Sequence, residues 1–197
     1  ANVLRYSAAI NKMKELIDSG VYGELKRVNW IITSWFRTQS YYNSGGWRAT
    51  WDGEGGGVLI NQCPHQIDLV QWVVGKMPAT VRGFCQYGRW HDIEVEDDVS
   101  IYAEYPNGAT GTFITTTADA PGTNRLEITM DKAKLVCQFN QESNEFEIKL
   151  YELEDSLSSY IKNASGGFDK PNGAWKTVET DGENPQHSGV MNAFAAH

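Results

Sequence analysis

Four residues in one stretch of the chain recur at helical spacing, and their types could bind and deprotonate a hydroxyl group. Asn61, His65, Asp68 and Trp72 lie three or four positions apart, so on a helix they share one face. A histidine side chain in water has a pKa of about 6.5, so its imidazole can accept a proton near neutral pH and return it in the reverse reaction. His65 is therefore the candidate proton carrier.

The two polar neighbours of His65 have narrower chemistry. The Asn61 amide cannot accept the proton, so it can only orient a substrate hydroxyl or the His65 ring by hydrogen bonding. Asp68 follows one turn later and either fixes the His65 tautomer or makes a structural hydrogen bond. A lone histidine on a helix is more often a structural residue than a catalyst, so the spacing alone does not make His65 catalytic.

One helix ending at Val74 must position these side chains. Its other face carries an apolar stripe that is expected to dock on a core, namely Ile67, Val70, Val73 and Val74. The glycines from Gly53 to Gly57 predict a turn that lets the backbone pack tightly before the helix. Since Pro64 lacks a backbone donor, the helix either starts near Cys63 or is kinked there.

The loop before this helix supplies aromatic and basic side chains that commonly line sugar sites. We predict that Tyr41, Tyr42, Trp47 and Arg48 bind the substrate, the aromatic rings by stacking and the guanidinium by donating to hydroxyls or a carboxylate. The same aromatic rings, with Trp51, could instead fill a hydrophobic seam.

The remaining pattern predicts an α+β fold: a large, mainly antiparallel open sheet with helices packed on one face. A helix is expected from Ser7 to Ser19 and a strand from Leu25 to Phe36. The later expected strands are Ala79 to Tyr87, Val99 to Tyr105, Ala109 to Thr117, Arg125 to Met130, Lys134 to Phe139 and Phe146 to Glu152. Pro106-Asn-Gly-Ala predicts a hairpin turn. An open face with Tyr and Thr residues is often closed by a second subunit.

The tail of the chain is rich in turn-forming residues. We interpret 156–184 as a loop with a short strand near 175–178. The run 186–197 begins as a helix and stops in mid-pattern, so we expect a piece of a longer protein.

Composition excludes several classes of protein. A chain of 197 residues with a net charge of −8 fits a single domain, residues 1–197, and argues against nucleic-acid binding. No apolar run or signal pattern indicates a membrane segment, so we expect a soluble, cytoplasmic protein. The three scattered cysteines Cys63, Cys85 and Cys137 indicate neither disulfides nor a zinc site.

An acidic run invites a metal-site hypothesis, which the alternation of its residues disfavours. The run comprises His91, Asp92, Glu94, Glu96, Asp97 and Asp98. Because apolar residues alternate with these acids, we interpret the acids as strand edges and solvated loops and predict no metal. His91 and His187 are read as loop residues.

The stretch from Gly55 to Asp68 resembles the active-site helix of the Gfo/Idh/MocA oxidoreductases. The likeness extends through Lys14–Glu24, Gly45-Gly-Trp-Arg48 and Glu94–Val99, and covers most of the chain to about Val136. It implies the C-terminal substrate and dimerisation domain of such an enzyme, with Asn61 standing where many members carry Asp. The N-terminal Rossmann domain is absent, since the chain has no Gly-x-Gly-x-x-Gly motif and no Glu-Lys-Pro motif.

The resemblance therefore implies an NAD(P)-dependent dehydrogenase acting on a sugar, polyol or related CH–OH substrate. NAD or NADP would be bound mainly by the missing domain, so this chain alone is expected to be inactive. A homo-oligomer through the open sheet face is also implied. Two alternatives stay open: a non-catalytic sugar-binding or dimerisation module, and a glycosidase relative that uses NAD transiently.

Overall fold

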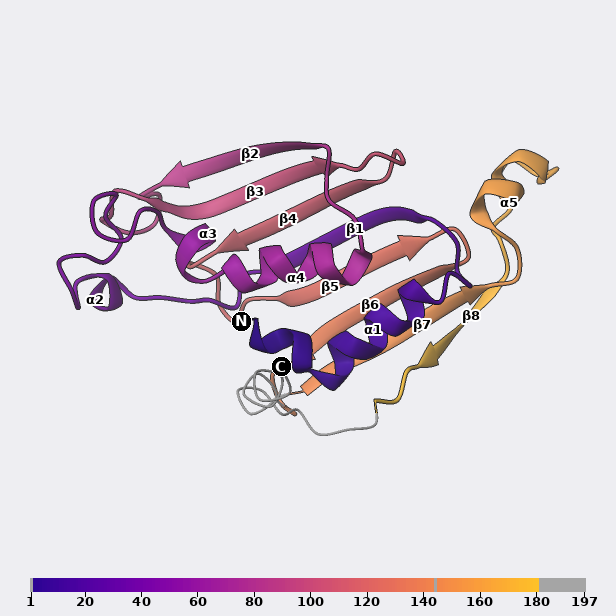
Figure 1. Cartoon of the computed structure of the whole chain (residues 1–197), viewed down its shortest axis with the longest axis horizontal. Helices are drawn as coiled ribbons and strands as arrows, with labels where there is room; N and C mark the ends of the chain where they lie inside the picture. Colours follow the sequence, from indigo (N-terminus) through magenta and orange to yellow (C-terminus); the bar gives the residue numbers. More distant parts are fainter. Residues whose placement is uncertain (1, 144, 181–197) are drawn as a thin grey trace, which may run out of the picture. The chain divides into compact units, whose positions relative to one another are not determined.

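A computed structural model describes residues 2–143 and 145–180, and in this part of the chain eight strands form one open, mixed, mostly antiparallel sheet. The strand order is β2-β3-β4-β1-β5-β6-β7-β8 (Figure 1). The strands are β1 (Leu25–Ile32), β2 (Thr80–Tyr87), β3 (Glu96–Glu104), β4 (Thr110–Thr116), β5 (Asn124–Met130), β6 (Ala133–Asn140), β7 (Glu145–Leu153) and β8 (Gly173–Thr177). The predicted α+β fold with a large, mainly antiparallel open sheet is confirmed.

Five α-helices and one short 3₁₀ helix accompany the strands in the described residues. They are η1 (Val3–Tyr6), α1 (Ala8–Asp18), α2 (Gln39–Tyr42), α3 (Val58–Asn61), α4 (Pro64–Val74) and α5 (Leu157–Asn163). None of the described helices is long and apolar enough to cross a bilayer. The helix expected within 186–197, and His187 with it, lie outside the described residues.

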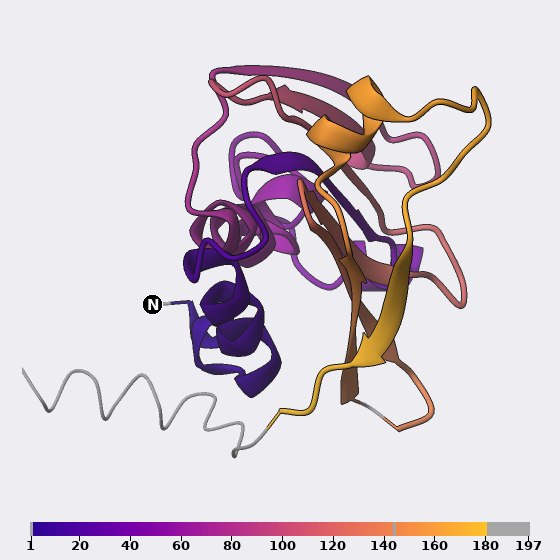
Figure 2. The ribbon, with the colours of Figure 1, turned by 90° about the vertical axis from the view of Figure 1, so that its right-hand side faces the viewer.

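The chain divides into two compact units. Unit 1 comprises 1–28, 69–76 and 127–197, and unit 2 comprises 29–68 and 77–126. Within unit 1, α1 packs against β7 and lies on one side of the strands (Figure 2). Ser7, where the helix was expected to begin, occupies the N-cap of α1, although its side chain makes no capping hydrogen bond. Alternate residues of β5 are buried, as the period of a strand with one face on a core requires.

Unit 2 contains the antiparallel ribbon β2-β3-β4, against which α3 packs (Figure 1). The predicted turn after Tyr105 joins β3 to β4, with Gly108 at a φ of 85° and its N–H donating to the Tyr105 carbonyl over 2.9 Å. Glycine is suited to this position because other residues rarely adopt such a φ. The hairpin expected from the sequence therefore forms.

Two strand boundaries differ from the sequence expectations, the central helix is broken, and one short helix was not expected. β1 ends at Ile32 rather than Phe36, because the following extended segment bonds to loop residues: the Thr33 N–H donates to the Thr123 carbonyl. β3 begins at Glu96, three residues before the expected Val99. The expected central helix is divided into α3 and α4, and α4 begins at Pro64, which agrees with the predicted helix start or kink near Cys63. The short helix α2 was not expected.

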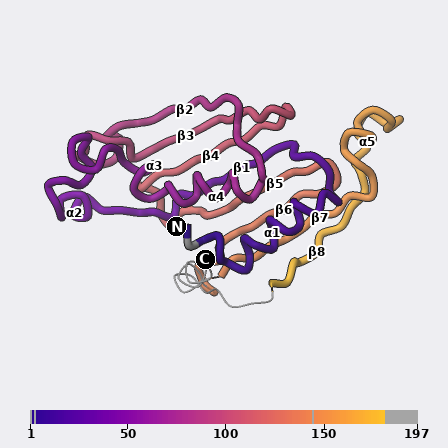
Figure 3. Tube along the Cα trace, viewed as in Figure 1, coloured from indigo at the N-terminus to yellow at the C-terminus, as the bar shows by residue number. Residues whose placement is uncertain are grey.

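Helix α5 lies in the tail that the sequence suggested was a loop, between β7 and β8 (Figure 3). The Ser156 hydroxyl caps it by accepting from the Ser159 N–H over 3.1 Å. Asp131, from the turn between β5 and β6, accepts from the N–H of Ser158 over 2.9 Å and from its hydroxyl over 2.8 Å. The helix is therefore fixed by a residue far away in the sequence.

Candidate functional site

Gly57 places the start of α3 in close contact with β3. The carboxylate of Glu96, which is only 6% exposed, accepts from the Leu59 N–H over 3.1 Å and so satisfies one of the free donors at the helix start. A Cβ atom on Gly57 would lie 2.0 Å from the backbone oxygen of Glu96. The tight backbone packing predicted from the glycine loop is thus confirmed at Gly57.

This contact leads to the first prediction. Replacing Gly57 with alanine should lower the free energy of unfolding by about 1–3 kcal/mol, because the new methyl group must displace backbone rather than a flexible side chain. Gly46→Ala is the matched control, since a Cβ there meets nothing within 4 Å; its effect should stay within about 0.5 kcal/mol. Denaturant unfolding of both variants checks this. Equal stability of the two would mean that Glu96 does not approach Gly57 so closely.

The break between α3 and α4 lies at Gln62 and Cys63. The Cys63 N–H reaches back five residues to the Val58 carbonyl over 3.0 Å, and Pro64 opens α4, where a missing N–H costs nothing. The Cys63 side chain is fully buried, with its sulfur 3.2 Å from the Thr115 hydroxyl. Burial raises the pKa of the Cys63 thiol to about 11, which makes it a buried anchor rather than a nucleophile.

α4 presents the predicted polar face. His65 and Asp68 are exposed, whereas Leu69, Val73 and Val74 are buried. Of the expected apolar stripe, Ile67 and Val70 are only partly buried. Trp72, the fourth residue of the predicted polar face, is half-buried; the guanidinium carbon of Arg5 lies 5.4 Å from its ring centroid and the Lys14 ammonium 5.1 Å.

A hydrogen-bonded cluster joins the loop to the end of α3. Arg48 Nη1 donates to the Tyr41 hydroxyl over 2.8 Å, and that hydroxyl donates to the Asn61 amide oxygen over 3.3 Å. The Gln62 amide also donates to the Asn61 oxygen, over 2.6 Å, and the Asn61 amide nitrogen donates to Glu54. The structure therefore brings together three of the predicted residues, Tyr41, Arg48 and Asn61.

Sequence reasoning missed two members of this cluster, Glu54 and Gln62. Glu54 could have been noticed in the sequence as a carboxylate inside the glycine loop directly before the polar helix. In the structure, the second carboxylate oxygen of Glu54 accepts from the Ala49 N–H over 2.8 Å. Gln62 gave no signal of its own, since its role depends on the break between α3 and α4.

Cation–π contacts hold the Arg48 side chain between two rings. Its guanidinium carbon lies 4.5 Å from the ring centroids of both Tyr41 and Trp47. Trp47 is 53% exposed, so one part of its ring contacts Arg48 while the rest remains open to a ligand. Such an aromatic surface beside a fixed guanidinium can stack on a sugar ring and donate to its hydroxyls.

Tyr42 lies in a different environment from Tyr41. It is buried with Ala49 and Val95, and its hydroxyl donates to the Thr117 hydroxyl over 2.9 Å. Burial raises the pKa of Tyr42. The structure therefore places this predicted substrate residue in the core beneath the cluster.

A cavity of about 380 Å³ opens in unit 2 beside Arg48. It is lined by Tyr42, Asn43, Gly45, Gly46, Arg48, Ala49, Thr50, Asp92, Ile93 and Glu94. Two segments thus form its walls, the loop after α2 and the loop after β2. Its polar and glycine-rich lining suits a hydroxyl-rich ligand.

The acidic run before β3 is not the solvated edge expected from the sequence. Glu96 is 6% exposed and accepts from the Leu59 N–H in α3, whereas Asp97 is fully buried and accepts from several N–H groups of the loop after β2. Glu94 also accepts from the Trp51 N–H over 3.2 Å. Among residues 2–143 and 145–180, no group of three or more His, Cys, Asp or Glu side chains could hold a metal ion.

Comparison with known proteins adds three structural relatives. The WlbA dehydrogenase from Bordetella pertussis, solved with NADH and UDP-GlcNAcA, is 28% identical with a TM-score of 0.62, over 67% of this chain and 40% of that one. Levoglucosan dehydrogenase, solved with NADH and L-sorbose, is 21% identical with a TM-score of 0.68, over 91% of this chain and 46% of that one. Aldose-aldose oxidoreductase from Caulobacter crescentus, complexed with glycerol, is 15% identical with a TM-score of 0.72, over 100% of this chain and 53% of that one.

Sequence identity and coverage decide what each likeness shows. At 21% and 15% identity the last two show the fold alone, and this chain spans about half or less of the length of each relative. No curated protein sequence matches the chain. The model of the GFO/IDH/MocA C-terminal domain matches residues 10–136, which is more than half of the chain. The chain therefore belongs to the GFO/IDH/MocA family, as a C-terminal domain.

Proposed function

We propose that this chain is the substrate-binding and proton-transfer half of an NAD(P)-dependent oxidoreductase that acts on a CH–OH group of a sugar or polyol. The observation that carries the proposal is the exposed polar face formed by His65 and Asp68, one turn after an Asn61 held by Tyr41. Membership of the family and relatives solved with NADH and sugar ligands support it.

The residues of this chain supply the polar half of the reaction. His65 accepts the hydroxyl proton as the carbinol carbon is oxidised and returns it in the reverse direction. Asp68, one turn later, holds the ring orientation. Asn61 orients the reacting hydroxyl, while Arg48 and Trp47 hold the rest of the sugar by donation and stacking.

NAD or NADP, when bound, supplies the hydride acceptor. This sequence has no strand followed by Gly-x-Gly-x-x-Gly, so these residues do not form a dinucleotide pyrophosphate site. We propose that another domain of the natural protein binds it.

Product analysis tests this function. The full-length natural protein, incubated with NAD(P)⁺ and a mixture of sugars, polyols and glycosides, should yield a product two hydrogens lighter than its substrate. Cleaved glycosides with no net nicotinamide reduction would instead identify the NAD-using glycosidase. Tight sugar binding with no product of either kind would identify a binding module.

We also propose a homo-oligomer through the open sheet face. In the pairings of β2 with β3 and of β3 with β4, Phe84, Ser100 and Ile114 lie side by side. Thr115, the next residue on β4, contacts Cys63, so it points to the face on which α3 packs. Because neighbouring residues of a strand point to opposite faces, the row of Phe84, Ser100 and Ile114 points away from α3. Phe84 is 71% exposed, a large apolar surface for a solvated strand.

Light scattering of a substituted protein checks the oligomer. Phe84→Asp should lower the molar mass to that of a smaller assembly, because a carboxylate would be buried without a partner. Val81→Asp is the matched control: Val81 is on the same strand, 55% exposed, but on the opposite face, so its mass should not change. A loss of mass in the Val81 variant alone would place the interface on the helix side.

A further inference from the structure

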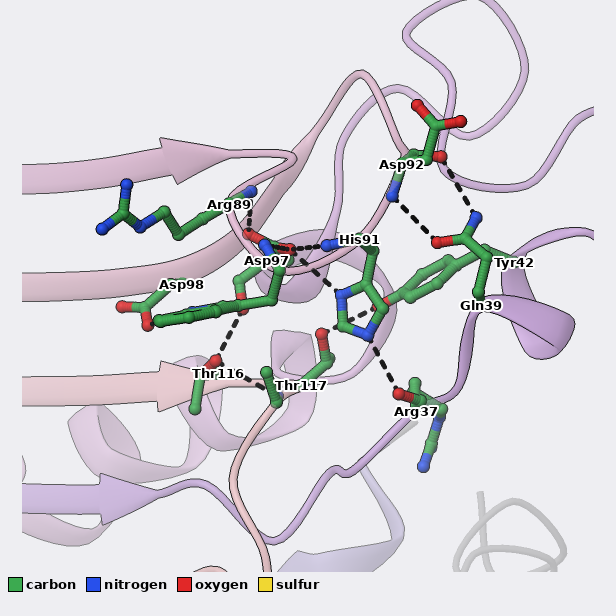
Figure 4. Close-up of polar contacts among 12 residues, drawn as sticks. Arg37, Gln39, Tyr42, Arg89, His91, Asp92, Asp97, Asp98, Thr116 and Thr117 are labelled. Carbon is green, nitrogen blue, oxygen red and sulfur yellow. Dashed lines mark hydrogen bonds and ion pairs between the residues drawn. The ribbon is translucent and has the colours of Figure 1, made fainter.

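The strongest unexplained feature of unit 2 is a buried carboxylate with three backbone donors. Asp97, fully buried at the start of β3, accepts from the N–H groups of Arg89 over 2.9 Å, Trp90 over 2.8 Å and His91 over 3.0 Å (Figure 4). Three such donors complement a negative charge. Asp97 therefore folds the loop after β2 around itself.

The His91 ring completes this arrangement. Its Nδ1 lies 3.0 Å from Asp97 Oδ2 and its Nε2 lies 2.9 Å from the backbone oxygen of Arg37. The side chain is only 7% exposed. A carbonyl oxygen only accepts, and the ionised Asp97 carboxylate only accepts, so both ring nitrogens must donate. These two contacts fix the ring between the Asp97 carboxylate and the Arg37 carbonyl.

The His91 ring connects the loop after β2 to the segment that carries the candidate site. Arg37 lies just before α2, and its guanidinium carbon is 5.0 Å from the Tyr41 ring centroid. The Tyr42 ring meets the His91 ring edge-on at 4.8 Å. Gln39 adds a second tie: its side chain accepts from the Asp92 N–H over 2.8 Å and donates to the Asp92 carbonyl over 3.2 Å (Figure 4).

We propose that His91 is a positioning residue, which holds the two walls of the cavity together and thereby sets Tyr41, the residue that Arg48 and Asn61 contact. Its effect on activity rests on the proposed function. The loop carrying Asp92 and Glu94 forms one wall, and the loop after α2 forms the other. Through Tyr41, a shift of the Arg37–Tyr42 segment would displace the substrate-binding amide of Asn61.

A double-mutant cycle in the full-length natural protein tests this role. His91→Gln should raise KM for the sugar roughly tenfold while kcat falls much less, since binding groups shift but His65 remains. In a Tyr41→Phe background the same change should have little further effect, because His91 acts through Tyr41. Equal, additive effects in both backgrounds would overturn the proposal.

The matched control comes from the same loop. Trp90 is 58% exposed and its indole N–H donates to Asp98 over 3.0 Å, away from His91. Trp90→Phe should leave both constants unchanged. A KM increase equal to that of His91→Gln would assign the effect to general loop disturbance and contradict the proposal.

A second measurement tests the His91 contacts without using activity. It needs only the wild-type protein, so it applies even if a variant fails to fold or no sugar is turned over. In the wild-type protein with ¹⁵N-labelled histidine, both ring nitrogens of His91 should show hydrogen-bonded protons, as contacts to two acceptors require. One bare ring nitrogen would overturn the proposal whatever the activity. Protons on both ring nitrogens without any sugar oxidation would contradict the proposed function and leave the positioning role of His91 supported.

Discussion

Replacing His65 with alanine should lower kcat/KM of the full-length natural protein by about 10²–10⁴, the usual contribution of a positioned acid–base residue. The loss should fall mainly on kcat, because Asn61, Arg48 and Trp47 remain to bind the sugar. Steady-state kinetics with the best substrate from a sugar panel measure the loss in kcat. Binding of that sugar to the variant shows whether its affinity is kept.

Asp68→Asn provides a graded comparison on the same helix. It keeps the side-chain shape and removes the charge, so it should lower kcat less than His65→Ala does. An unchanged kcat in His65→Ala would remove His65 from the mechanism. A larger loss in Asp68→Asn than in His65→Ala would make Asp68 the stronger candidate for the proton acceptor.

Replacing Asp97 with alanine should lower the free energy of unfolding by about 3–5 kcal/mol, as expected when one partner of a buried ion pair is removed. The change leaves the His91 ring and the N–H groups of Arg89 and Trp90 without their acceptor. Burying unpaired donors costs free energy that the smaller side chain does not recover. Urea unfolding followed by circular dichroism gives the difference.

Asp98→Ala is the control for Asp97, since it is the next residue on β3 and only half-buried. Its carboxylate accepts one hydrogen bond, from the indole N–H of Trp90, over 3.0 Å. The expected loss is under about 1 kcal/mol. Losses of the same size in both variants would mean that Asp97 is not the buried acceptor on which the loop folds.

Periodicity in the sequence predicted the sheet well, because alternation and turn residues act locally. The hairpin at Gly108 and the strands after it were predicted to within a few residues; Phe146 to Glu152, for example, corresponds to β7 at Glu145–Leu153. Strand burial follows a period of two, so the pattern itself carries the information.

Local pattern could not predict elements fixed by distant residues. α5 is capped in part by Asp131, and nothing near 157–163 in the sequence announces that contact. Asp97 looked like one more acid in a solvated run, since alternation assigns a face but does not show that a loop will fold its N–H groups around the carboxylate. His91 likewise was read as an ordinary loop residue.

The sequence pattern predicted only the part of the candidate site that lies on a regular helix. Helical spacing correctly placed His65 and Asp68 on an exposed face, because α4 is regular over that span. Tyr41 and Tyr42 are adjacent and identical in type, so their composition gave no means of separating them. The single turn of α2 sends one hydroxyl to Asn61 and the other to Thr117.

The most direct test of the account is the initial rate of NAD(P)⁺ reduction by the full-length natural protein across a panel of sugars and polyols, followed by the absorbance of the reduced nicotinamide. We predict reduction that depends on both enzyme and sugar and that disappears almost entirely in His65→Ala. No reduction with any member of the panel, from a protein that binds both nucleotide and sugar, would contradict the assignment of this chain to the substrate half of a sugar dehydrogenase.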